Sequence, residues 1–147
     1  MKLKRGHSLP DGDHVVRYVA WNRLRRDGDD NVLGVLPQAF SLRDGENSLS
    51  VNWLEYYESD RSTNLTECVK AFRNIFSRGK KSGYAVANVF NVKAVFLREQ
   101  RPIKIVYEPT QNKAHSAIYA KIDDDLALLE ELGSEFYKEF HFDSKFP

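Results

Sequence analysis

The sequence predicts a single α+β domain in which a mostly antiparallel sheet packs against two principal amphipathic helices, at about residues 64–78 and 123–140. Three observations support this fold class. Short runs rich in β-branched and aromatic residues alternate polar and apolar positions, as half-buried strands do. Two longer segments carry an apolar stripe at helical spacing. The segments follow the order strands, helix, strands, helix, and each helix must bury its stripe against the sheet.

Two strands are predicted in the first part of the chain. Residues 14–19 (His-Val-Val-Arg-Tyr-Val) are mainly β-branched and aromatic, which favours a strand. Residues 49–53 (Leu-Ser-Val-Asn-Trp) alternate apolar and polar positions, the pattern of a strand with one buried face. Between them we expect a polar loop over residues 23–31, followed by two short extended pieces over 32–42 that Pro37 separates.

The clearest helix of the sequence is predicted at about residues 64–78. Its apolar positions recur at intervals of three and four residues and therefore form one stripe. Asn64 is expected to cap the N-terminus, with Glu67 three residues later, and Gly79 to end the helix in a left-handed conformation. The stripe consists of Leu65, Cys68, Val69, Phe72 and Phe76.

The second half of the chain predicts further strands. Residues 84–89 form one of them, and residues 103–107 pair with residues 114–121 as a hairpin. Residues 92–97 fit either a strand or a short helix, because their apolar positions satisfy both periods.

The terminal helix, residues 123–140, begins in an aspartate cluster whose charges suit a helix N-terminus. Gly133 lies on its apolar stripe, where glycine costs about 1 kcal/mol relative to alanine. We expect this glycine to permit a close contact between helix and sheet. The other stripe residues are Ile122, Leu126, Leu129, Phe136 and Phe140.

One domain is predicted over residues 13–142, between a flexible N-terminal arm (1–12) and a short C-terminal tail (143–147). The 22 basic and 21 acidic residues nearly balance, so the overall charge does not favour DNA, RNA or an anionic membrane. The chain has a single cysteine and no secretory leader, and no apolar run approaches the ~20 residues that cross a bilayer. We therefore expect a cytoplasmic protein without a membrane partner.

Several kinds of site are not supported by the motifs. Residues 27–31 begin like a calcium loop, but Val32 stands where the loop needs glycine and Gln38 where it needs glutamate. The chain lacks both a phosphate-binding glycine loop and a nucleophile elbow. Cys68 lies on the buried stripe of a helix, which favours a structural thiol. We expect neither a metal nor a cofactor.

Four residues are candidates for a metal-independent catalytic site: His14, Arg17, Glu55 and His115. Histidine titrates near neutral pH and can move a proton, a carboxylate can orient it, and arginine can hold a phosphate with two hydrogen bonds. Such a set would serve phosphodiester cleavage or nucleotide-group transfer, including an ADP-ribosyl-type transfer by Arg17, Ser50 and Glu55. The site requires an imidazole within about 7 Å of the Glu55 carboxylate or the Arg17 guanidinium. A structural or surface role for each histidine is the alternative.

A binding surface is the other interpretation of the sequence, because aromatic and arginine side chains anchor interfaces, hold phosphates and stack bases. The residues proposed for a protein interface are Trp21, Trp53, Tyr56, Tyr57 and Arg61. The residues proposed for a basic and aromatic group are Trp21, Arg23, Arg25 and Arg26, and a second basic group comprises Arg73, Arg78, Lys80 and Lys81.

The leading hypothesis is a small cytoplasmic accessory module that acts in a protein complex through the aromatic surface around residues 53–57, with a nucleic-acid-handling protein as one candidate partner. The rival hypothesis is the small metal-independent enzyme acting on phosphodiesters or nucleotides. Weak nucleic-acid binding through the arginine groups is the third. The sequence identifies neither the substrate nor the oligomeric state. Strand parity places Glu55 on the buried side unless the strand ends or bulges before it, so its role depends on the group that it meets.

Overall fold

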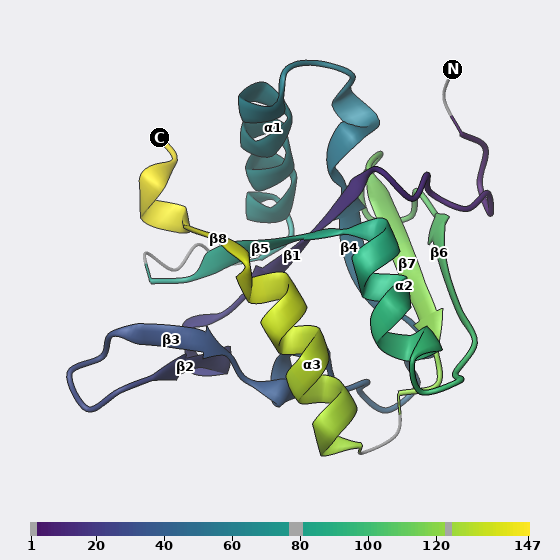
Figure 1. The fold of residues 1–147 in the computed structure, drawn as a ribbon. Coiled ribbons are helices and arrows are strands. Elements are labelled where there is room, and N and C mark those ends of the chain that lie inside the picture. Colours follow the sequence, from purple (N-terminus) through teal and green to yellow (C-terminus); the bar gives the residue numbers. More distant parts are fainter. Residues whose placement is uncertain (1–2, 77–80, 123–124) are drawn as a thin grey trace.

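A computed structural model of the chain describes residues 3–76, 81–122 and 125–147, and it confirms the α+β class. Six strands form an antiparallel sheet in the order β6-β7-β4-β1-β5-β8, and two more form a separate hairpin (Figure 1). The sheet strands are β1 (His14–Val19), β4 (Leu49–Trp53), β5 (Gly83–Asn88), β6 (Ile103–Tyr107), β7 (His115–Ala120) and β8 (Glu139–Phe142), and the hairpin strands are β2 (Leu24–Arg26) and β3 (Val32–Val35). The helices within the described residues are α1 (Arg61–Arg73), α2 (Val89–Leu97) and α3 (Leu126–Tyr137).

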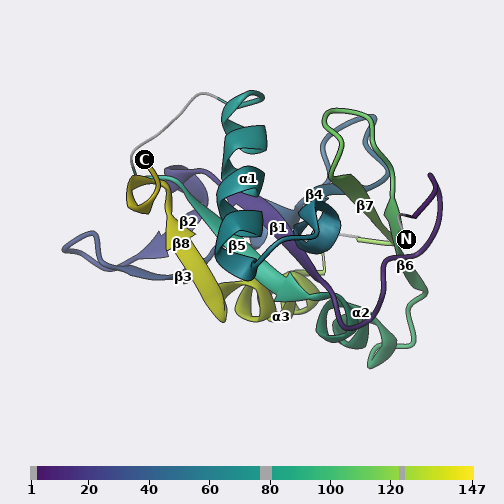
Figure 2. The same ribbon diagram turned by 90° about the horizontal axis from the view of Figure 1, so that it is seen from above.

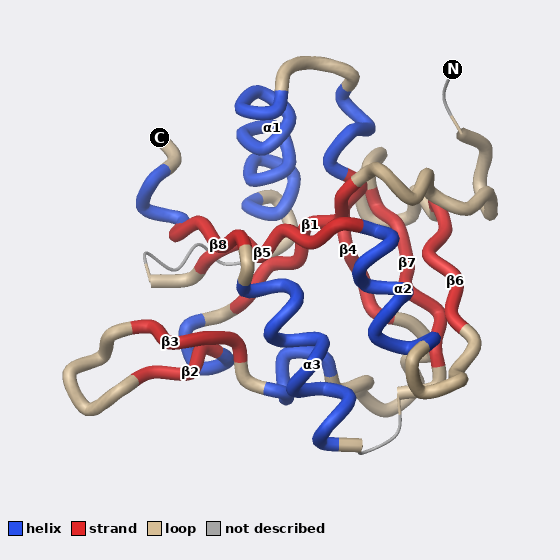
Figure 3. Tube along the Cα trace, viewed as in Figure 1, coloured by secondary structure: helices blue, strands red, loops and turns tan. Residues whose placement is uncertain are grey.

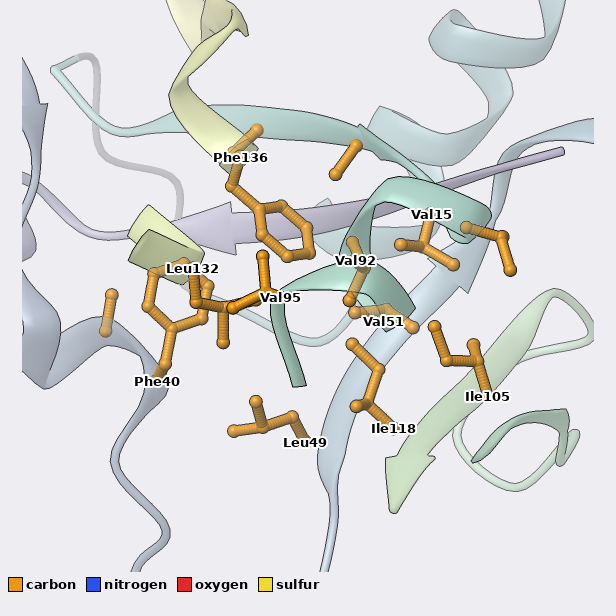
Figure 4. Packing of buried hydrophobic residues seen from close by; sticks show 14 of the residues in the cluster. Val15, Phe40, Leu49, Val51, Val92, Val95, Ile105, Ile118, Leu132 and Phe136 are labelled. Carbon is orange, nitrogen blue, oxygen red and sulfur yellow. The ribbon is translucent and has the colours of Figure 1, made fainter. Parts of the chain in front are cut away.

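The sheet divides the hydrophobic interior into two clusters, because successive side chains of a strand point to opposite faces. Val15 and Val19 of β1 belong to the larger cluster, with α2 and α3, whereas Val16 and Tyr18 lie with α1 on the other face. Figure 4 shows side chains of β4, β6 and β7 meeting those of α2 and α3 in the larger cluster. Figure 2 shows α1 over β1 and β5, away from β6 and β7. The second face of the sheet is therefore only partly covered by a helix.

Residues 21–42 contain more regular structure than the predicted loop and extended pieces. Leu24–Arg26 and Val32–Val35 pair as β2 and β3, and Asp27 closes the turn between them by accepting the backbone N–H of Asn31 at 3.0 Å. Pro37 begins a 3₁₀ helix, Pro37–Phe40, in place of a second extended piece. Proline suits the first position of a helix, since its missing N–H has no helical partner there.

Helix α1 carries the predicted stripe but begins earlier than predicted. Asp60 is its N-cap and accepts the backbone N–H of Thr63 at 2.8 Å, so the helix starts at Arg61. Asn64 is therefore not the cap; its side chain is buried and accepts the backbone N–H of Ser59 at 3.1 Å. Helix α1 ends at Arg73, and the predicted stop at residue 79 lies outside the described residues.

The ambiguous segment in the second half of the chain is a helix. Asn88 caps α2 by accepting the backbone N–H of Asn91 at 3.0 Å, and Val92, Val95 and Phe96 are buried. Both strand and helix periods fitted these residues, and the cap at Asn88 is consistent with the helix. The predicted hairpin is confirmed, since β6 and β7 pair from Ile103↔Ala120 to Tyr107↔Ser116.

Helix α3 is shorter than the predicted terminal helix, because residues 139–142 leave it and form β8. Asp125 caps α3 by accepting the backbone N–H of Leu128 at 3.2 Å. The predicted close approach at Gly133 occurs against the β2–β3 hairpin: a Cβ there would lie 2.9 Å from the Val35 carbonyl oxygen. The other two aspartates of the predicted cluster, residues 123–124, lie outside the described residues.

The expected flexible arm and tail are both docked in this structure. Gly6 and Leu9 donate backbone hydrogen bonds to Tyr107 and Ile105 of β6 at 2.7 and 2.9 Å, and Leu9 is only 2% exposed. The outer strand β6 offers unpaired backbone groups, which these residues satisfy. At the other terminus, Asp143 is 1% exposed and Arg73 binds the segment that follows it. Residues 6–9 are therefore held against β6, and residues 143–146 against α1.

Candidate functional site

A cavity of about 650 Å³ lies where the sheet opens between β1 and β4. These strands pair only at Val15↔Trp53 and Val16↔Asn52, whereas β1 stays paired with β5 as far as Val19. Figure 3 shows the two strands diverging from their paired ends. Residues of β1, β4 and the end of α1 line the cavity, together with the segment after β3. Ligand pockets commonly measure roughly 300–1,000 Å³, so this cavity is large enough for a small molecule.

Arg17 spans the opening between the diverging strands. Its Nε and Nη2 atoms donate to the Ala39 carbonyl at 3.0 and 2.7 Å, and Nη1 donates to the Ser50 carbonyl at 2.7 Å. A guanidinium has five N–H groups, so two remain beyond these three hydrogen bonds. Burial lowers the pKa of Arg17 to about 10, and the side chain stays protonated at neutral pH. No ion pair to Arg17 is found among the described residues, which leaves a largely buried cation at the cavity.

Asn52 and His115 lie next to each other in the cavity lining. They are register partners on β4 and β7, and their side chains are 0% and 5% exposed. Within the described residues, neither Asn52 Nδ2 nor His115 Nε2 has a hydrogen-bond partner. The Asn52 side chain interacts weakly with the neighbouring Cys68 sulfur and acts to lower the pKa of that thiol, but the contact does not have the geometry of a hydrogen bond. Burial raises the pKa of Cys68 to about 12, which fits the predicted structural thiol.

The end of α1 and the turn that follows it, residues 74–76, form an apolar wall of the cavity. The Tyr18 and Phe76 rings stack with centroids 4.6 Å apart and an interplanar angle of 9°. Phe72 lies beside both rings, and Ile75 and Phe76 are 39% and 40% exposed. A planar ligand group could therefore contact aromatic surface here while charged groups stay near the rim, which includes Arg23, Arg43 and Glu46.

His14 and Glu55 form a pair of their own. His14 Nδ1 lies 2.7 Å from Glu55 Oε2, and the backbone N–H of His14 donates to Oε1 at 2.7 Å. The predicted catalytic site required an imidazole within about 7 Å of the Glu55 carboxylate or the Arg17 guanidinium, and the His14 imidazole meets this requirement. Strand β4 ends at Trp53 and a 3₁₀ helix follows, so the strand parity that placed Glu55 on the buried side does not reach it.

The four predicted catalytic residues fall into two groups. Arg17 and His115 line the cavity, whereas His14 and Glu55 are not part of its lining. Of the three residues considered for an ADP-ribosyl-type transfer, Arg17 and Ser50 line the cavity, whereas Glu55 does not. A single site that uses all four side chains is therefore not assembled in this structure.

The aromatic residues after β4 pack mainly against one another. Trp53 is only 6% exposed, and its Nε1 donates to the Asp13 carboxylate at 2.8 Å, so it belongs to the core. Tyr56 lies edge-on to Trp53 and stacks on Tyr107 with centroids 6.0 Å apart. Tyr57 is half-buried, and burial is the main cause that raises its pKa. The surface predicted here is reduced to the exposed parts of Tyr56 and Tyr57.

The arginines of the first basic group are partly neutralised. Arg25 forms an ion pair with Glu130 at 2.6 Å, and Arg26 pairs with Asp30 at 3.2 Å while its guanidinium lies 4.3 Å from the Trp21 ring centroid. Arg23 differs from them, since it lies at the rim of the cavity. Of the second basic group, residues 78 and 80 lie outside the described residues.

Arg61 binds Glu139 of β8 through two hydrogen bonds of 2.6 Å each. His141 also contacts Glu139, at 2.8 Å. Burial acts to raise the pKa of Glu139, but the hydrogen bonds from Arg61 and His141 outweigh it and lower the value to about 2. Arg61 therefore ties the start of α1 to β8, and its predicted interface role competes with this structural one.

Sequence reasoning did not select Asn52, Phe76 or Arg43 as site residues. Asn52 alternates with apolar neighbours on a predicted strand, which shows only that it points away from the larger core. The cavity depends on where β1 and β4 separate, and that is set by pairings between residues far apart in the sequence. The one local sequence pattern that pointed to the cavity wall was the placement of Phe72 and Phe76 on the same predicted apolar stripe.

The comparisons with known proteins add no functional information, because no protein-family model, curated protein or solved structure gave a significant match to the chain. Among the described residues, no helix has the length and apolar character to cross a membrane. The same residues contain no group of three or more His, Cys, Asp or Glu side chains arranged to hold a metal ion.

Proposed function

We propose that this protein binds a small anionic ligand in the cavity between β1 and β4. The observation that carries the proposal is the Arg17 guanidinium, a largely buried cation with no ion pair among the described residues and two N–H groups to spare. The Glu46 carboxylate acts to raise the pKa of Arg17, but it forms no ion pair with Arg17 and burial outweighs its effect. A buried charge without a direct ion pair is unfavourable, so the cavity is suited to a ligand that supplies a negative group.

Phosphate is the anionic group that fits this environment best. Arginine binds phosphate through charge-assisted, frequently paired hydrogen bonds. Arg23 and Arg43 stand at the rim against Glu46, which gives the opening a net positive character. The proposal keeps the phosphate chemistry of the rival hypothesis and uses two of its residues, Arg17 and His115. The His14–Glu55 pair takes no part in it.

The test compares Arg17→Gln and Arg17→Lys with the unaltered protein. Isothermal titration with inorganic pyrophosphate and ribose 5-phosphate measures anion affinity. Arg17→Gln removes the charge, so its affinity is expected to fall at least about tenfold, the effect of losing one charge-assisted hydrogen bond. Arg17→Lys keeps the charge without the paired donors, and we expect an intermediate loss.

Arg98→Gln is the matched control, because Arg98 is exposed, forms its ion pair with Glu131 and does not line the cavity. Circular dichroism of each variant checks that the fold is intact. Absence of binding by the unaltered protein, or equal binding by Arg17→Gln, would contradict the proposal.

An accessory module that captures a protein partner is the second candidate. It is supported by the side-by-side position of Tyr56 and Tyr57, whose rings are 5.2 Å apart and both partly exposed near the start of α1. Replacing both by alanine is expected to weaken capture of a partner in a pull-down while the thermal midpoint stays nearly constant. Unfolding of the double variant would instead assign the two rings to packing, as the contacts of Tyr56 with Trp53 and Tyr107 suggest.

A further inference from the structure

The hydrogen-bond network fixes the orientation of the Asn52 amide. The backbone N–H of Ala114 donates to Asn112 Oδ1 at 2.9 Å, so the other amide atom of Asn112 is its Nδ2 donor. That donor lies 3.1 Å from Asn52, and the atom that receives it must be the acceptor Oδ1. The atom of Asn52 left without a partner is therefore Nδ2, which carries two N–H groups.

The tautomer of His115 follows from the same reasoning. Its Nδ1 lies 2.6 Å from the backbone carbonyl oxygen of Glu108, which can only accept a hydrogen bond. Nδ1 must therefore carry the proton, and in the neutral ring Nε2 is a bare acceptor. Thr110 Oγ1, at 3.1 Å from Nδ1, lies on the same side of the ring. The unpaired atom of His115 is thus an acceptor, opposite in kind to that of Asn52.

The sheet places this donor and this acceptor next to each other. Trp53 donates its backbone N–H to the Ala114 carbonyl at 2.9 Å, so the neighbouring pair Asn52↔His115 is of the kind that exchanges no backbone hydrogen bonds. Side chains of such pairs approach more closely than those of hydrogen-bonded pairs. Both unpaired atoms are buried, and a buried donor or acceptor without a partner is unfavourable. A group that enters here with one acceptor and one donor side by side would pair both.

We propose that the anionic ligand is a nucleotide, whose base presents adjacent acceptor and donor atoms to Asn52 and His115 while its phosphate lies toward Arg17. Nucleobases carry such acceptor and donor pairs on their edges, and proteins read extruded bases by hydrogen bonds to them and by stacking. The Phe72 and Phe76 rings supply apolar surface for the base in the same cavity. This inference rests on the proposed anion binding and adds the class of ligand.

The test separates the base from the phosphate. Titrations with adenosine 5′-monophosphate (AMP), ribose 5-phosphate and the dinucleotide ApA are made on the unaltered protein, Asn52→Leu and His115→Phe. We expect AMP to bind at least about tenfold more tightly than ribose 5-phosphate, since two hydrogen bonds and a stacked ring are added. In either variant the advantage of AMP is expected to shrink while ribose 5-phosphate binds as before. A higher affinity for ApA than for AMP would identify a nucleotide within a strand as the source.

The outcomes distinguish this inference from the proposal beneath it. Equal affinity for AMP and ribose 5-phosphate overturns the nucleotide class but leaves anion binding intact. Absence of binding by all three compounds overturns both.

Should the variants fail to fold, the ¹⁵N resonance of His115 Nε2 in the unaltered protein serves instead. A shift on adding AMP but not ribose 5-phosphate supports base contact, and an unchanged resonance with both ligands bound contradicts it. Arg98→Gln, which lies outside the lining, is again the matched control and is expected to bind all three compounds as the unaltered protein does.

Discussion

Replacing Asp143 by alanine is expected to lower the free energy of unfolding by about 3 kcal/mol, because it leaves a buried hydrogen-bonded network without its acceptor. Asp143 is 1% exposed and accepts from Tyr84 Oη at 2.6 Å and from Arg73 Nε at 3.0 Å. Arg73 also donates to the carbonyls of Asp143 and Phe146. Without the carboxylate, the Tyr84 hydroxyl and the Arg73 guanidinium both lose a partner in a largely buried setting.

Urea denaturation followed by circular dichroism measures this effect. Glu131→Ala is the matched control, since Glu131 forms an exposed ion pair with Arg98 at 3.2 Å. Exposed pairs of this kind contribute less than about 1 kcal/mol. A loss for Asp143→Ala no larger than that of the control would show that the network does not hold the C-terminal segment to α1 and β5.

Replacing Phe136 by alanine is expected to lower the free energy of unfolding by roughly 4 kcal/mol, the effect of a large cavity in a core that cannot close around it. Phe136 is fully buried between the sheet and the 3₁₀ helix before β4, and its ring centroid lies 5.2 Å from that of Phe40 (Figure 4). Helix α3 depends on this contact because its stripe is what holds it against the rest of the fold.

Leu126→Ala is the control for this prediction, since Leu126 lies in the same helix but is 62% exposed. The control is expected to change stability by less than about 0.5 kcal/mol. Thermal and urea denaturation of both variants provide the comparison. If the two substitutions had similar effects, helix propensity rather than packing would account for the stability that α3 contributes.

Local patterns predicted the elements of this fold well. Strands β1, β4 and β6 appear where period-two and β-branched patterns placed them. The ends of elements were less accurate. Helix α1 begins at Arg61 because Asp60 competes successfully with Asn64 for the role of cap. The terminal helix stops at Tyr137 because the following residues pair with β5.

The candidate site was predictable only in part. Glu55 does meet a histidine, since His14 Nδ1 lies 2.7 Å from its carboxylate, and Arg17 and His115 both line the cavity. Nothing in the sequence shows that Arg17 and His115 line a cavity while the His14–Glu55 pair lies outside it, because the cavity depends on the divergence of β1 and β4. Trp53 received two conflicting predictions, an interface role from its residue type and a core position from its alternation with Leu49 and Val51, and it lies in the core.

The pairing of residues 6–9 with β6 has a consequence for how copies of this protein meet one another. An edge strand with unpaired backbone groups is a template onto which another chain can add, the first step of domain swapping and of fibril growth. Here Gly6, His7 and Leu9 occupy the backbone groups of β6. The other edge strand, β8, is only four residues long and carries the charged Glu139. Both edges of the sheet are thus protected against intermolecular strand addition, and at β6 the N-terminal residues provide this protection against aggregation.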